Sequence, residues 1–103
     1  MRLLLAIGLL IFTATVVMAQ TPPPYVKPEG LRQITSQVHV IPDNSVPTVS
    51  NIGIIVGDRA TLVVDTGLGP PNGAKVLAVA QKLGGSRQLY LVITHFHPEH
   101  DLG

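Results

Sequence analysis

The residue types that could do chemistry gather in the last ten residues of the chain. Three of its four histidines lie there, at His95, His97 and His100. Glu99 and Asp101 place two carboxylates among them. Imidazole nitrogens and carboxylate oxygens are the ligands by which proteins hold zinc and related ions. The cluster therefore predicts a metal site.

The spacing of the cluster supports this interpretation. His95 and His97 are two residues apart, so in extended chain both side chains point to the same side. Pro98 favours extended backbone at His97 and suits the first position of a helix, so the chain can turn and bring His100 back. The alternative is a plain polar loop in which Glu99 only favours a helix N-terminus. The position directly after an apolar strand favours metal ligation.

Zinc chemistry determines what such a site would do. A zinc ion with an open position lowers the pKa of a bound water to roughly 7. A carboxylate beside the metal can orient that water or carry its proton. No nucleophilic serine or cysteine is needed, and the absence of cysteine from the chain excludes a thiolate zinc site and disulfides.

The elements that must position the cluster begin with strands. Residues 37–41 have strand composition, and alternation places His39 opposite Val38 and Val40, which predicts a surface residue rather than a ligand. Residues 51–56 and 60–64 predict a hairpin with its turn at 57–59. Runs of adjacent apolar residues in both strands predict burial on both faces.

A helix and a last strand complete the scaffold. Asn72 is the expected cap of a helix that ends at Leu83, before Gly84 and Gly85. Its core face is expected to carry Val76, Val79, Ala80 and Leu83. Residues 88–93 predict a strand that runs directly into Thr94 and the histidines. Ligand sites of layered α/β folds lie at such strand ends.

The first nineteen residues predict a secretory signal peptide. Arg2 precedes an apolar run, and cleavage is expected after Ala19. A membrane anchor is the alternative, but the run is shorter than the roughly 20 residues of a spanning helix. We therefore expect a secreted or periplasmic protein whose contact with the membrane, through the signal peptide, is transient. Residues 20–30 are rich in proline and predict a spacer before the fold.

The charge of the chain narrows its partners. Apart from Arg2, six basic residues balance six acidic ones, and no basic stripe suggests nucleic acid. The expected partner is a small-molecule substrate, while the sequence leaves the oligomeric state open.

Three segments of the sequence together resemble a known family. Thr94 to His100, together with Asp65-Thr66-Gly67 and the segment Asn51 to Gly57, is similar to the metallo-β-lactamase superfamily. The resemblance covers residues 31–103 and implies a mixed α+β or α/β fold, the N-terminal part of a four-layer αββα sandwich. Further ligands of the family fall after Gly103, so the chain is expected to be a truncated N-terminal portion.

The resemblance also implies a role for each candidate residue. His95 and His97 would bind a first metal ion, and His100 a second. Glu99 stands where the family usually has Asp, as a metal ligand and catalytic helper of the water. Asp65 would brace the metal loop. The implied cofactor is zinc, as one or two ions, or iron if the longer side chain of Glu99 alters the site.

Three functions follow. The first is an exported zinc-dependent hydrolase that uses a metal-activated water on an ester, thioester, amide or lactam bond. The second is a non-catalytic module of the same fold that binds a metal or a ligand. The third is a dimeric aspartic protease that uses Asp65-Thr66-Gly67. The sequence does not identify the substrate.

Overall fold

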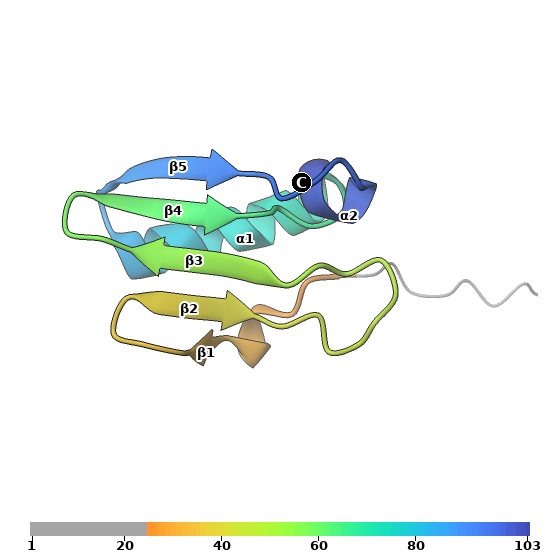
Figure 1. Ribbon diagram of the computed structural model, residues 1–103, viewed down its shortest axis with the longest axis horizontal. Coiled ribbons are helices and arrows are strands. Elements are labelled where there is room, and N and C mark those ends of the chain that lie inside the picture. The colour runs from red at the N-terminus through yellow and green to blue at the C-terminus, as the bar shows by residue number, and fades with distance from the viewer. Residues whose placement is uncertain (1–24) are drawn as a thin grey trace, which may run out of the picture.

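Short runs of aliphatic and β-branched residues pair into one five-stranded sheet, with a long helix across one of its faces (Figure 1). The computed structural model of the chain describes residues 25–103. In sheet order the strands are β1 (Arg32–Gln33), β2 (Val38–Ile41), β3 (Ile52–Val56), β4 (Ala60–Val64) and β5 (Gln88–Val92). The helical elements are η1 (Pro28–Gly30), α1 (Gly69–Gly84) and α2 (Pro98–Asp101).

The pairing of β4 with β5 decides where a site can form. All other neighbours in the sheet are antiparallel, but β4 and β5 run parallel, with Val64 opposite Val92. Parallel strands need a crossover, and α1 supplies it. The carboxyl ends of both strands therefore lie at one edge of the sheet, beside α2 and the last residue (Figure 1). Asp65 and Thr94 follow those two ends.

The structure confirms the predicted hairpin of β3 and β4, the strand before the histidines and the helix that begins at Pro98. The predicted start of α1 is wrong. The helix begins at Gly69, with prolines in its first turn, and Leu68 caps it without a side-chain bond. Proline suits the first turn because the N–H groups there have no helical partner. Asn72 instead lies inside the helix, where its side chain accepts from the Val26 N–H (2.7 Å) and donates to the Leu68 carbonyl (2.7 Å).

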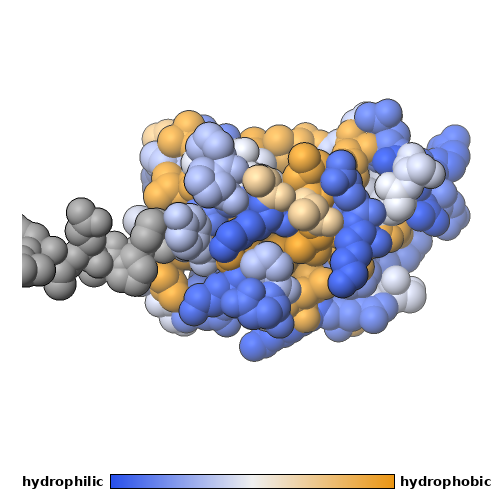
Figure 2. All heavy atoms as spheres, turned by 180° about the vertical axis from the view of Figure 1, so that it is seen from behind, coloured by the Kyte–Doolittle hydropathy of each residue, from blue (hydrophilic) through white to orange (hydrophobic). Residues whose placement is uncertain are grey.

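Burial in the sheet is one-sided. The strand residues that face α1 are buried, and three of the predicted core residues of the helix, Val76, Val79 and Ala80, pack on them. On the opposite face Ile55, Leu62 and Val64 are only half-buried. Burial of β3 and β4 on both faces is therefore not seen among residues 25–103. The hydrophobic and hydrophilic side chains of the α1 side are seen in Figure 2.

His39 was expected on the surface, and this expectation is wrong. Alternation does place it opposite Val38 and Val40, but its own face is the one that α1 covers. His39 shares that face with Ile41, which is fully buried. The Nδ1 atom of His39 is also buried and has no hydrogen-bond partner among residues 25–103. The two valines that flank the histidine suggested the wrong inner face, because alternation alone does not say which face of a strand is turned toward the core.

The described residues hold one mixed sheet and one helical layer, which is consistent with part of the expected αββα sandwich rather than with all of it. Packing begins before Leu31, since Val26 belongs to the buried core. The predicted signal peptide lies outside the described residues. Within residues 25–103, no helix is long and apolar enough to cross a membrane.

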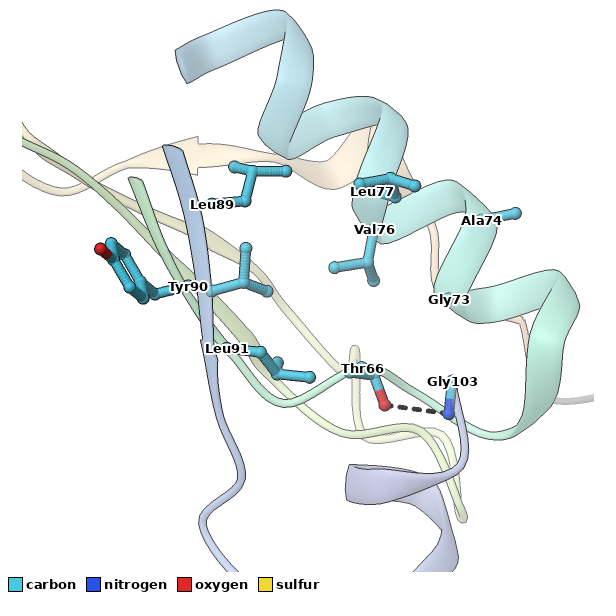
Figure 3. A pocket seen from close by; sticks show the side chains of 10 residues that line it. Thr66, Gly73, Ala74, Val76, Leu77, Leu89, Tyr90, Leu91 and Gly103 are labelled. Carbon is cyan, nitrogen blue, oxygen red and sulfur yellow. Dashed lines mark hydrogen bonds between the residues drawn. The ribbon is translucent and has the colours of Figure 1, made fainter. Parts of the chain in front are cut away.

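An apolar groove of about 340 Å³ runs between α1 and β5. In Figure 3, Leu89 and Leu91 point toward the helix, whereas the ring of Tyr90 points away from it. Gly73 and Gly103 lie at the end of this groove. A Cβ on Gly73 would collide with the Gly103 carbonyl oxygen, so glycine at this position lets the end of the histidine loop (residues 94–103) approach α1.

Candidate metal centre

Asp65 is the anchor of the histidine loop. It directly follows β4 and is 3% exposed. Its Oδ1 accepts the backbone N–H of Thr94 (2.8 Å), and the Thr94 hydroxyl lies 2.9 Å from Oδ2. Oδ2 also lies 2.7 Å from Nδ1 of His100. The carboxylate therefore ties the end of β4 to both ends of the loop, as expected of a residue that braces metal ligands.

The electrostatics of Asp65 fit this role. Burial by itself raises the pKa of the carboxyl group, but hydrogen bonds from the Thr94 N–H, His100 and the Thr94 hydroxyl outweigh burial, so the pKa lies below its usual value. The group is thus a carboxylate at neutral pH. Its oxygens are engaged within the chain, which does not favour pairing with a second Asp65 in a dimeric aspartic protease.

Asp65 and Thr94 also determine which nitrogen of His95 is available. Because the Thr94 hydroxyl can donate to Asp65, it accepts from Nδ1 of His95, 3.0 Å away. Nε2 of His95 then carries a free lone pair, as in metal-binding histidines whose other nitrogen is held by a neighbour. This tautomer is inferred from the hydrogen-bond network.

The free nitrogen of His95 faces His97. Nε2 of His95 lies 3.2 Å from Nδ1 of His97, and the two ring centroids are 4.6 Å apart. Nitrogens that share a tetrahedral zinc ion, at about 2.0–2.1 Å each, lie roughly 3.3–3.4 Å from one another. The two imidazoles thus fit a common ion with little movement. Without metal, Nδ1 of His97 can carry a proton and donate a hydrogen bond to Nε2 of His95.

Glu99 and His100 complete the loop from α2. Oε1 of Glu99 lies 3.9 Å from Nδ1 of His97, beside the nitrogen pair. The His100 ring packs 4.0 Å from the His95 ring, centroid to centroid, and its Nδ1 faces Asp65. Asp65 would thus fix the tautomer that leaves Nε2 of His100 free to bind a metal ion.

The structure brings together every residue that the sequence predicted for the site: Asp65, His95, His97, Glu99 and His100. It does not bring them into a finished ligand set. No group of three or more His, Cys, Asp or Glu side chains in the described part of the chain, residues 25–103, could hold a metal ion as it stands. The assignment of individual ligands therefore stays a prediction.

Three residues that support the loop were missed by the sequence analysis. Thr94 was given no role although it is the second residue after β5. Thr66 hydrogen-bonds the carbonyl oxygen of His100, and Ser50 that of Glu99. Thr66 stands beside Asp65 in a motif that was considered only for its acid. Ser50 had no local signal, because its partner lies 49 positions later in the chain.

The model of a family described as the metallo-beta-lactamase superfamily matches residues 45–103, which include β3, β4, α1, β5 and α2. No curated protein matches the chain. The matched range contains Ser50, Asp65 and the whole histidine loop.

Proposed function

The chain belongs to the metallo-beta-lactamase superfamily, and from this premise we propose that it is part of an exported zinc-dependent hydrolase of small molecules. The proposed reaction is the hydrolysis of an ester, thioester, amide or lactam bond. The observation that carries the proposal is the 3.2 Å separation of Nε2 of His95 and Nδ1 of His97, with the Thr94 hydroxyl as hydrogen-bond acceptor at the other nitrogen of His95.

The donor set fits zinc. We assign His95 and His97 to one ion, with His100 and Glu99 as the ligands offered to a second ion or to a wider site. When bound, zinc supplies Lewis acidity and lowers the pKa of a water molecule to roughly 7. Glu99 is partly buried next to the nitrogen pair, so its carboxylate can accept a proton at that position. The contact of Asp65 Oδ2 with Nδ1 of His100 favours the tautomer in which Nε2 of His100 is free to bind a metal ion.

We also propose that the protein works outside the cytoplasm, after cleavage of a signal peptide behind Ala19. The sequence of the first nineteen residues supports this part of the proposal. The test is the mass of the mature protein recovered from the exported fraction. A mature chain that begins at Gln20 is expected, and retention of Met1 to Ala19 in the exported protein would contradict it.

The alternative is a module that binds metal or a ligand without turnover. Two observations favour it: Glu99 replaces the shorter acid usual in the family, and no three-ligand group in residues 25–103 is ready to hold an ion. The two proposals share the fold and differ in chemistry. Retention of zinc without hydrolysis of any substrate class would favour the module.

The experiment uses the full-length protein, purified without chelators. We expect bound zinc by elemental analysis, and hydrolysis of at least one member of a panel of aryl esters, thioesters, lactones and β-lactams. Removal of the metal with a chelator should abolish turnover, and added zinc should restore it. Absence of any transition metal in the purified protein would refute the hydrolase and the zinc site together.

A matched pair of variants tests Glu99. Glu99→Gln removes the charge but keeps the shape, and we expect a loss of kcat of about 100-fold or more, since 100-fold is the lower end of the range for a general base. Glu29→Gln makes the same change at an exposed position of η1 and should leave kcat at the wild-type value. Equal activity of both variants would remove Glu99 from the mechanism.

A further inference from the structure

Two buried hydroxyl groups hold the main chain of the turn that carries Glu99 and His100. Ser50 precedes β3, is 4% exposed and donates from Oγ to the carbonyl oxygen of Glu99 at 2.7 Å. Thr66 follows Asp65, is 8% exposed and donates from Oγ1 to the carbonyl oxygen of His100 at 3.0 Å. These contacts join segments that are 49 and 34 positions apart.

Both the backbone N–H and the hydroxyl group of Thr66 form hydrogen bonds with the histidine loop. Its backbone N–H donates to the same His100 carbonyl at 2.9 Å. Its hydroxyl oxygen accepts the N–H of Gly103 at 2.9 Å, the bond drawn as a dashed line in Figure 3. Two adjacent residues therefore fix His100. Asp65 binds its side chain, and Thr66 binds its main-chain carbonyl group.

The turn needs such support from outside. α2 has four residues, and a helix of one turn is not stable by itself. Its own support includes the bond from the His100 N–H to the His97 carbonyl (2.8 Å) and that from the Leu102 N–H to the Pro98 carbonyl (3.2 Å). A fixed carbonyl fixes the peptide plane, and this sets the direction in which the side chains of Glu99 and His100 leave the backbone.

We propose that Ser50 and Thr66 are positioning residues that hold Glu99 and His100 in ligand-competent orientation before metal binds. The proposal rests on the zinc site proposed above. Ser50 acts on the residue whose longer side chain has more freedom than the usual Asp. Thr66 acts on the residue that Asp65 already orients. Neither hydroxyl is proposed to touch metal or substrate.

The first test compares two variants of Thr66 in the full-length protein. Thr66→Val has nearly the same shape and no hydroxyl, whereas Thr66→Ser keeps the hydroxyl. Removing a group that orients a metal ligand typically costs about 10- to 100-fold in metal affinity, so we expect a loss of this size for Thr66→Val. Thr66→Ser should restore the wild-type affinity. The readout is zinc affinity by competition with a chelating dye, with the visible spectrum of the Co²⁺ form as a signature of ligand geometry.

The second test needs no metal. In the zinc-free protein, Thr66→Val should speed amide hydrogen exchange at Gly103 and His100, because Thr66 accepts from the first and holds the carbonyl of the second. Ser50→Ala should speed exchange at His100 and Leu102, whose N–H groups close the α2 turn. Ser86→Ala removes a hydroxyl from an exposed turn before β5 and should change neither exchange nor affinity.

A general loss of stability must be separated from positioning. Ile54→Val shortens a fully buried core side chain and serves as a destabilised control that should keep the zinc affinity of wild type. Should Thr66→Val fail to fold, Ser50→Ala carries the test alone. Unchanged affinity and unchanged exchange in Ser50→Ala and Thr66→Val would overturn the inference, as would an equal loss of affinity in Ile54→Val. A wild-type protein that binds no zinc refutes the proposed function, and hydrogen exchange then decides whether the hydroxyls hold the turn.

Discussion

The candidate metal centre has a buried half and an exposed half, and the two are held differently. In the buried half the side chains of Asp65 and His100 are 4% and 19% exposed, and their contact joins the end of β4 to α2. In the exposed half the His97 side chain is 55% exposed, and its ring packs on its neighbours Phe96 and His95. One half is thus fixed by tertiary structure and the other by local contacts.

The backbone dihedral angles also differ between the two halves. Asp65 has a φ of 66°, in the left-handed region that costs energy for residues other than glycine. That cost is offset only where surrounding contacts hold the residue in place, and Thr94 and His100 provide them. His97 has an extended φ of −70° and ψ of 141°, which any residue before proline adopts. We infer that the buried half is built in advance, whereas the exposed half is completed by what it binds.

The largest expected loss of stability comes from removing the carboxylate of Asp65 in the buried half. Asp65→Ala leaves the Thr94 N–H and His100 without their acceptor and places alanine at a positive φ. With each lost charge-assisted hydrogen bond worth about 1.5–3 kcal/mol, we expect the free energy of unfolding to fall by about 3 kcal/mol. Urea denaturation of the zinc-free protein measures this, and a loss within the error of the method would contradict the pre-built half.

Acid provides an independent control for Asp65. The pKa of its carboxyl is lowered in the folded state, so its contribution to stability is present above the unfolded value near 3.8 and declines as pH falls toward the folded pKa. The wild type should therefore lose more stability below about pH 4 than Asp65→Asn, which does not titrate. Parallel curves for the two proteins would show that Asp65 gains nothing from its partners.

Zinc should stabilise mainly the exposed half. At 100 times its dissociation constant, a ligand of the folded state raises the free energy of unfolding by about 2.7 kcal/mol. We expect the added protection from hydrogen exchange to concentrate at His95, Phe96 and His97, since the amides near Asp65 are already protected. Magnesium at the same concentration is the control. Zinc protection confined to the buried half would reverse the proposed division.

The sequence allowed much of this to be predicted because the information was local. The hairpin, the strand before Thr94 and the turn at Pro98 depend on runs of adjacent residues and on proline geometry. The histidine cluster could be found because its candidate ligands are neighbours in sequence. Asp65 came from a resemblance, and the structure shows the physical reason: parallel β4 and β5 bring it beside Thr94.

What could not be predicted depends on segments far apart in sequence. The inner face of β2 is the one that continues the buried face of β3, where His39 lies opposite Ile54, so His39 was placed on the wrong side. Asn72 resembles a helix cap, but Val26 reaches back from the N-terminal segment to bind its side chain. Ser50 and Thr66 act on carbonyl groups, which every residue has, so no side-chain pattern could identify their partners.

His100 lies between the two halves, and its removal should have an intermediate effect. His100→Ala deprives Oδ2 of Asp65 of one partner, while the Thr94 hydroxyl remains 2.9 Å from the same oxygen. We expect a loss of about 1.5–2 kcal/mol in the free energy of unfolding, the lower part of the range for one hydrogen bond to a charged group, because the His100 side chain is partly exposed. His100→Gln, whose amide can donate to Asp65, should recover part of that stability but not the affinity for zinc.

The smallest effect on stability is expected for His97→Ala, and it makes the sharpest test. The side chain is mostly exposed, and exposed substitutions usually change the free energy of unfolding by less than about 0.5 kcal/mol. Without metal, the variant should therefore unfold like the wild type. With zinc present, it should lose most of the stabilisation that the wild type gains, because Nε2 of His95 no longer has the partner nitrogen 3.2 Å away. Unfolding measured with and without zinc separates the stability of the metal-free protein from the stabilisation by zinc. The control is Phe96→Ala, which changes an exposed neighbour with no ligand atom and should keep the zinc response. A His97→Ala variant that is unstable without metal would place His97 in the pre-built half, and the division between the two halves would then have to be drawn elsewhere in the loop.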